Sequence, residues 1–178
     1  MKLLILGMGN TLFSDDGVGI AVVRELQKCY HQNEDIAVVE TSWGGFRIID
    51  LLSGFDAAIV IDAIQTDQHP AGTIYHLQPE ELVNSVRMVS FHDINFVTAL
   101  EFARQMDIPM PEYISIYAIE VVETELISEE ITPAVRPAVD PCVQKIIDEI
   151  ENNIFSERSK DDRRKLNRIG SPGACHSH

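Results

Sequence analysis

Apolar residues follow two different patterns along this chain, and the first pattern predicts strands. Five stretches are short and mostly apolar, and they end at glycine, acidic or polar positions: 2–9, 36–40, 57–64, 71–78 and 112–120. Runs that are apolar at consecutive positions are typical of strands buried on both faces. The stretch 71–78 is less apolar than the others, and we expect it to form an edge strand.

The second pattern has apolar residues three or four positions apart, which is the periodicity of amphipathic helices. It occurs in four stretches: 16–30, 45–54, 92–106 and 132–154. Asp15 or Asp16 is expected to cap the first helix, because aspartate is favoured at that position. Pro137 and Pro141 disturb the start of the last stretch, so we expect its helix to begin near residue 140.

Strands that alternate with helices predict an α/β fold, a three-layer sandwich whose mostly parallel, twisted sheet carries helices on both faces. We see no internal repeat, and we expect one domain over residues 1–155. Residues 156–178 are polar and without periodicity, which predicts a disordered tail. In parallel sheets of this kind, ligands bind beyond the carboxyl ends of the strands.

The charge of the chain narrows the classes of partner. The 178 residues have a net charge of -14, whereas a nucleic-acid-binding protein needs a basic face. The same charge disfavours anionic membrane surfaces, and no apolar run is long enough to span a bilayer. A metal cation or a basic protein suits the charge better. Three cysteines without a CxxC pair, and no signal-peptide pattern, predict a cytoplasmic protein.

Two adjacent carboxylates, Asp15 and Asp16, follow the first predicted strand and need a partner to offset their repulsion. Asp62 terminates the third strand and His92 opens a helix, so Asp16, Asp62 and His92 are expected at one rim of the sheet. One imidazole and two carboxylates would form a cation site with open positions. Each residue alone also has a structural interpretation: a helix cap, an acceptor for backbone amides, or a helix-start residue.

The glycine loop GMGN, residues 7–10, leaves a second interpretation open, a nucleotide-binding or other cofactor-binding α/β domain. The dinucleotide fingerprint requires a third glycine, but Leu12 occupies that position. Phosphates would also be repelled by Asp15 and Asp16. No GxxxxGK[ST] motif is present, and neither GxSxG nor HExxH occurs, which disfavours serine hydrolases and ordinary zinc peptidases.

The stretch LLILGMGNTLFSDDGVGIAVVREL, residues 3–26, resembles the opening of the hydrogenase maturation proteases. The stretch AAIVIDAI, residues 57–64, is similar to the second motif of that family, an apolar strand that ends in aspartate. The stretch SFHDINF, residues 90–96, is similar to its third motif. The resemblance covers about residues 1–150, and it implies a phosphorylase/hydrolase-like α/β fold.

The resemblance implies an endopeptidase that removes the C-terminal extension of a nickel-iron hydrogenase large-subunit precursor after nickel insertion, and so activates the hydrogenase. Asp16, Asp62 and His92 match the catalytic, metal-binding positions. Nickel would be recognised in the substrate and need not stay bound in the resting enzyme. Either the metal polarises the scissile carbonyl or the bound water, or a carboxylate such as Asp15 or Asp16 acts as general base.

Four matters stay open at this point. A nickel-sensing chaperone that does not cleave is an alternative to a peptidase, and a monomer is expected although the sequence does not set the oligomeric state. Thr41, Ser42 and Trp43 stand where the family commonly has a GGT turn, which leaves the client hydrogenase undetermined. Glu130 stands where the family favours glycine. Trp43 is either a contact for the partner or a cover for the sheet edge.

Overall fold

The computed structural model describes residues 1–83 and 96–154. The chain divides into two compact units, Met1–Val143 and Gln144–His178. The first unit contains the sheet, and the described part of the second contains most of the last helix. The expected domain end at residue 155 and the tail at 156–178 lie outside the described residues and stay predictions.

The strands form a sheet with the order β2-β1-β3-β5-β4 within the described residues. Their bounds are β1 Leu3–Met8, β2 Ile36–Thr41, β3 Ala57–Ile64, β4 Ile74–Leu77 and β5 Tyr113–Glu120. All pairings are parallel except that of β4 with β5, which is antiparallel. The mostly parallel sheet is therefore confirmed, and β4 is the edge strand expected from its weaker apolar pattern.

The observed helices lie within the four stretches that the helical periodicity predicts. Their bounds are α1 Val18–Tyr30, α2 Arg47–Leu52, α3 Phe96–Gln105 and α4 Val139–Glu149, with 3-10 turns η1 Ser14–Gly17, η2 Pro79–Val83 and η4 Arg136–Ala138 and a π-helical end η5 Ile150–Ile154. Pro137 lies in η4, and α4 begins directly after that turn, as the two prolines predict. The expected start of α3 at residue 92 lies outside the described residues.

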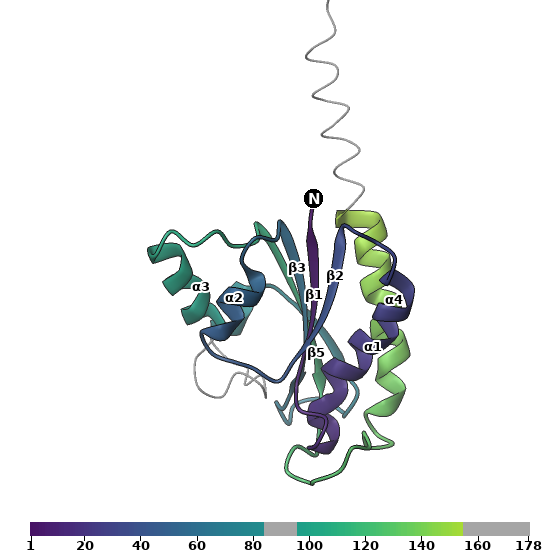
Figure 1. The fold of residues 1–178 in the computed structure, drawn as a ribbon. Helices are drawn as coiled ribbons and strands as arrows, with labels where there is room; N and C mark the ends of the chain where they lie inside the picture. The colour runs from purple at the N-terminus through teal and green to yellow at the C-terminus, as the bar shows by residue number, and fades with distance from the viewer. Residues whose placement is uncertain (84–95, 155–178) are drawn as a thin grey trace, which may run out of the picture. The chain divides into compact units, whose positions relative to one another are not determined.

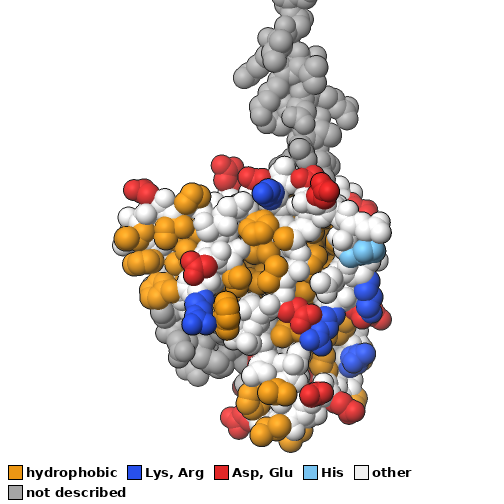
Figure 2. All heavy atoms as spheres, in the orientation of Figure 1, with side chains coloured by type: hydrophobic (Ala, Val, Ile, Leu, Met, Phe, Trp, Pro, Cys, Tyr) orange, Lys and Arg blue, Asp and Glu red, His pale blue; other side chains and the backbone are white. Residues whose placement is uncertain are grey.

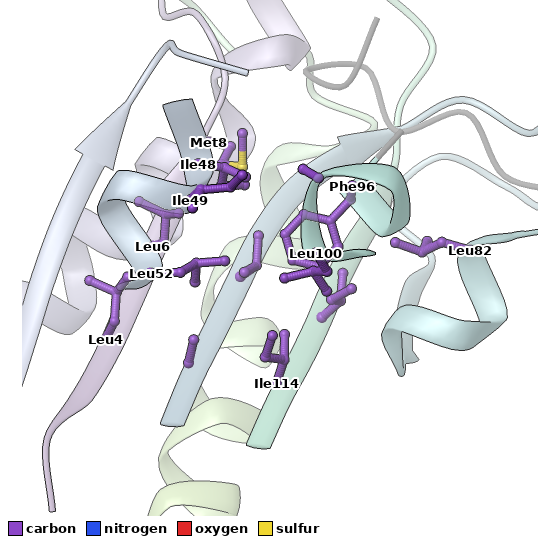
Figure 3. Close-up of a cluster of buried hydrophobic side chains, with 14 of the residues drawn as sticks. Leu4, Leu6, Met8, Ile48, Ile49, Leu52, Leu82, Phe96, Leu100 and Ile114 are labelled. Carbon is purple, nitrogen blue, oxygen red and sulfur yellow. The ribbon is translucent and has the colours of Figure 1, made fainter. Parts of the chain in front are cut away.

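Helices cover both faces of the sheet in the first unit (Figure 1). α1 packs against β1, β2 and β3, whereas α2 and α3 pack on the opposite face. The core on that second face runs from Leu4, Leu6 and Met8 of β1 to Phe96 and Leu100 of α3 (Figure 3). Because both faces are covered, every residue of β1 and β3 is buried, which explains their unbroken apolar runs.

A close approach of α1 to the sheet depends on Gly19. A Cβ at this position would collide with the carbonyl oxygen of Met8 and lie 2.6 Å from that of Ile61. The first turn of α1 therefore sits directly on the backbones of β1 and β3, beside the position that precedes Asp62. No helix in the described parts of the chain is long and apolar enough to cross a membrane.

The expected capping of α1 by Asp15 or Asp16 is wrong. The residue at the N-cap is Gly17, and no side chain caps the helix. Ser14 has a φ of 45° and begins the 3-10 turn η1, so both aspartates lie within a turn that precedes the helix. Their carboxylates bind partners elsewhere, as described below.

Candidate active site

Asp62 lies in β3 on the face covered by α2 and α3. Its side chain is fully buried, and Oδ1 accepts a hydrogen bond of 2.8 Å from the backbone N–H of Ala63. The strand continues to Ile64, so Asp62 is two residues from the end of β3 and does not terminate it. In register beside it stands Ala118 of β5. A residue held within a paired strand offers its carboxylate in one fixed position.

Asp16 lies in the turn η1, which leaves the carboxyl end of β1. It is 9% exposed, and its Oδ2 accepts a hydrogen bond of 2.8 Å from the backbone N–H of Asn10. η1 contacts β3, so the structure brings the segments that carry Asp16 and Asp62 together at one edge of the sheet. Parallel α/β sheets bind ligands at this edge.

The loop before η1 is shaped by Gly9. This residue has a φ of 136°, and a Cβ on it would collide with the carbonyl oxygen of Asp16. Only glycine fits a backbone with this φ and this neighbour. Gly9, the second glycine of the GMGN loop, thus allows the backbone of Asp16 to lie against the loop.

His92, the third expected site residue, lies outside the described residues. Phe96 follows it by four positions and is buried in the core cluster that also contains Val60, two residues before Asp62. Within residues 1–83 and 96–154, no group of three or more His, Cys, Asp or Glu side chains could hold a metal ion. The three-residue site therefore stays a prediction, with Asp16 and Asp62 placed and His92 not.

Asp15 has a different role from its neighbour. Its fully buried carboxylate accepts hydrogen bonds from the backbone N–H of Thr132 at 2.7 Å, the hydroxyl of Thr132 at 3.1 Å and the N–H of Glu123 at 3.2 Å. These contacts hold η1 against the connection that follows β5. Asp15 and Asp16 are the two carboxylates considered as general base. Because the Asp15 carboxylate holds the turn in place through these hydrogen bonds, Asp16 is the better candidate for the base.

The sequence interpretation missed a buried carboxylate at the end of β5. Glu120 is 1% exposed and accepts hydrogen bonds from the hydroxyls of Thr66 and Tyr75, both at 2.7 Å, and from the N–H groups of Thr66 and Asp67. Burial alone would raise the pKa of Glu120, but these hydrogen bonds lower it below its usual value. No local pattern marks this role, because the donors come from the connection after β3 and from β4.

The GMGN loop does not offer its amides to a ligand. The N–H of Gly9 donates to the carbonyl of Thr41 at 3.2 Å, and that of Asn10 donates to Asp16. The side chain of Asn10 accepts from the N–H of Leu12 at 3.0 Å. A phosphate site needs free backbone N–H groups, so these contacts disfavour the nucleotide-binding alternative.

The family model of the hydrogenase maturation proteases matches residues 20–149. The chain belongs to this family. A hydrogenase expression/formation protein HupD from Thiocapsa roseopersicina is 25% identical over 143 residues, which cover 75% of this chain and 64% of that protein. The hydrogenase 2 maturation protease of Escherichia coli is 28% identical over 82 residues, covering 46% and 50%. The chain thus spans between half and two thirds of these curated relatives.

Solved structures agree with the fold of this maturation protease family. The hydrogenase maturating endopeptidase HybD from Escherichia coli superposes with a TM-score of 0.66 at 21% identity, covering 85% of this chain and 93% of that one. A [NiFe] hydrogenase maturation protease HybD from Thermococcus kodakarensis gives a TM-score of 0.60 at 24% identity, covering 82% and 97%. At these identities the likeness shows a shared fold.

The two departures from the family pattern have clear places in the fold. Trp43 is 53% exposed, with the Arg47 guanidinium 4.7 Å from its ring centroid. The backbone N–H of Trp43 donates to the Thr41 hydroxyl at 3.0 Å. Its ring therefore adds little to the core, and its contact role stays a prediction. Glu130 contributes its carbonyl oxygen, which accepts from the Ser14 hydroxyl at 2.9 Å. This contact uses the backbone, so glutamate can replace glycine there.

Proposed function

We propose that this protein is the endopeptidase that removes the C-terminal extension of a nickel-iron hydrogenase large-subunit precursor once nickel has been inserted. Membership of the hydrogenase maturation protease family supports the reaction class. The observation that supports particular residues in this role is that the turn with Asp16 contacts strand β3, which contains Asp62, at the carboxyl end of the sheet.

Nickel belongs to the substrate in this proposal. Asp16, Asp62 and His92 are the residues proposed to hold it during cleavage, and carboxylate and imidazole donors suit such a cation. A bound metal ion supplies Lewis-acid polarisation of a carbonyl or a water. Two of the proposed metal ligands are held in place before the substrate binds. Asp62 lies within a paired strand and accepts from the Ala63 N–H, and Asp16 accepts from the Asn10 N–H.

Hydrolysis also requires a group that accepts a proton. A water adds its oxygen to the scissile carbonyl carbon and gives one proton to a base, and the C–N bond then breaks as the leaving nitrogen takes up a proton. Where nickel only docks the substrate, a carboxylate is the base. Asp16 is proposed for that role, because the Asp15 carboxylate already accepts three hydrogen bonds from Thr132 and Glu123.

The cellular setting follows as part of the proposal. The protein is proposed to be a cytoplasmic monomer, and its net charge of -14 disfavours nucleic-acid and anionic membrane partners. The client is a single class of protein substrate, and the hydrogenase itself is left open.

The test is a cleavage assay with purified protein and two forms of the precursor, nickel-loaded and nickel-free. Intact-mass spectrometry is expected to show a released C-terminal fragment only with the nickel-loaded form. Nickel-dependent binding without a fragment would replace the peptidase by a nickel-sensing chaperone. Equal cleavage of both forms would remove nickel from substrate recognition.

A further inference from the structure

Exposed apolar side chains gather on two loops at the carboxyl end of the sheet. Leu12 is 53% exposed, Leu126 56% and Ile127 80%. The loops are joined, since the N–H of Ser128 donates to the carbonyl of Leu12 at 3.0 Å and the N–H of Ser14 donates to the carbonyl of Ser128 at 2.7 Å. We name the surface formed by residues 11–14 and 122–131 the loop platform. Figure 2 shows hydrophobic and acidic side chains together at the lower end of the molecule, where Figure 1 draws the connection after β5.

The loop platform is held in one conformation by its own polar groups. The Glu123 carboxylate accepts hydrogen bonds from the N–H groups of Glu125 and Leu126, at 2.9 and 2.8 Å, and these bonds lower its pKa. The Asp15 carboxylate binds Thr132 at one end of the loop. Apolar side chains that a hydrogen-bonded scaffold presents to water mark a recognition surface, because little entropy is lost when a partner binds.

The charge of the loop platform specifies the partner further. Glu125, Glu129 and Glu130 are exposed on it, and residues 121–135 contain no lysine or arginine. Electrostatic complementarity therefore favours a protein surface that combines apolar with basic side chains. A second copy of the same acidic surface would place like charges against each other, which disfavours self-association through this face.

Two hollows connect the loop platform to the neighbourhood of Asp16. One, of about 300 Å³, is lined by Leu12 and by Gly9 and Asn10, the residues that contact Asp16. The other, of about 450 Å³, extends from Glu129 and Ile131 to Ser14 and Gly17, and Arg24 and Arg136 also line it. The loop platform thus adjoins residues that flank Asp16, although neither Asp16 nor Asp62 lines these hollows. Because arginines line the larger hollow, the basic part of a partner is expected on the exposed glutamates outside it.

We propose that the loop platform docks the precursor through a segment in which apolar residues are flanked by lysine or arginine. The inference rests on the proposed function and adds to it the chemistry by which the protein substrate is selected. Leu126 and Ile127 enter the apolar part of the contact, and Glu129 and Glu130 pair with the basic part. Selection takes place outside the site of cleavage.

The experiment compares the full-length protein with Ile127→Asp and with a Glu129→Lys, Glu130→Lys variant, using nickel-loaded precursor. Both variants are expected to raise KM at least tenfold while kcat changes less than twofold. Met106→Asp is the matched control: Met106 is 59% exposed and follows α3, outside the loop platform, so its KM is expected to be unchanged. Binding of nickel-loaded precursor is measured in parallel by titration calorimetry.

The outcomes separate this inference from the proposed function. Cleavage by the wild type with unchanged KM and affinity in both platform variants would overturn the docking site and leave the peptidase intact. If the wild type does not cleave the precursor but both platform variants bind it more weakly than the wild type, the docking site is retained and the peptidase is rejected. A wild type that dimerises in sedimentation, with a monomeric Ile127→Asp variant of unchanged KM, would show a self-association surface and overturn the inference.

Discussion

The carboxylate of Asp15 is bound to Thr132, 117 positions later in the chain, through both the backbone N–H and the hydroxyl of the threonine. This pair fastens the turn that carries Asp16 to the connection after β5. The adjacent aspartates at 15 and 16 therefore have separate tasks. Asp15 fixes the turn, and Asp16 is left at the edge of the sheet where Asp62 also lies.

The Thr132 hydroxyl can be removed without changing the size of its side chain. Thr132→Val is expected to lower the free energy of unfolding by about 1–3 kcal/mol, since a hydrogen bond to a buried carboxylate is lost. Thr132→Ser keeps the hydroxyl and is the control, with a loss of less than about 1 kcal/mol. Urea denaturation measures both. Equal stability of the valine variant and the wild type would show that the contact contributes nothing.

Gly9 tests how tightly the loop is fitted around Asp16. Gly9→Ala places a Cβ against the Asp16 carbonyl and forces alanine to a φ of 136°, so a loss of about 3 kcal/mol or more is expected. Gly54→Ala is the matched control. Its φ is also positive, at 88°, but nothing lies within 4 Å of the added Cβ, so the cost is only about 1 kcal/mol. Thermal unfolding that is equally affected by both substitutions would contradict the close fit.

Glu120 predicts a pH dependence of stability. Its pKa is lowered in the folded state, so its contribution is complete above the usual value of 4.5 and is lost as the pH falls through the folded pKa. Glu120→Gln is expected to reduce the free energy of unfolding by about 1–3 kcal/mol at pH 7. The difference between wild type and variant should shrink as the pH falls below 4.5 and through the lowered pKa of Glu120. Denaturation at several pH values measures it, and a constant difference would refute the assignment.

Tyr75 offers a check on the same network. Burial and the neighbouring Glu120 carboxylate raise the pKa of Tyr75, whose hydroxyl donates to that carboxylate. If Tyr75 anchors Glu120, Tyr75→Phe is expected to reduce the pH dependence attributed to Glu120 without abolishing it, because Thr66 still donates.

His92 is predicted from sequence to complete the site. His92→Ala is expected to reduce the rate of precursor cleavage at least 100-fold, because one proposed ligand of the substrate nickel is lost. His76→Ala is a control, since His76 contacts Ser115 and stacks on Tyr117 within the sheet. Circular dichroism checks that both variants are folded. Cleavage by His92→Ala at the wild-type rate would remove this residue from the site.

Much of the fold follows from local pattern. The strand at 57–64 and the helix starting near 140 appear where periodicity and proline place them, because burial on both faces and loss of an N–H act locally. The partners of Asp15 and Glu120 could not be predicted, since their donors are remote in sequence and lie in loops without periodicity or, for Tyr75, in the edge strand β4. The expected cap of α1 failed for a related reason: the turn η1 gives both aspartates other partners.

The convergence of Asp16 and Asp62 was predictable from the parallel topology alone. Strands β1 and β3 pair in parallel, so residues at or after their carboxyl ends reach the same edge. The topology alone does not distinguish Asp15 from Asp16. The resemblance of residues 3–26 to the family motif names Asp16, whereas the contacts of Asp15 with Thr132 and Glu123 become visible only in the structure.

Asp62→Asn tests whether the buried carboxylates at the carboxyl end of the sheet carry out the cleavage. The amide has the same shape, can still accept from the Ala63 N–H and costs less to bury than a charge, so the variant should be at least as stable as the wild type. The measurement is the single-turnover rate of fragment release from nickel-loaded precursor, followed by mass spectrometry. We expect no fragment on the time scale of wild-type cleavage. Release at the wild-type rate by the folded variant would show that the Asp62 carboxylate takes no part in cleavage.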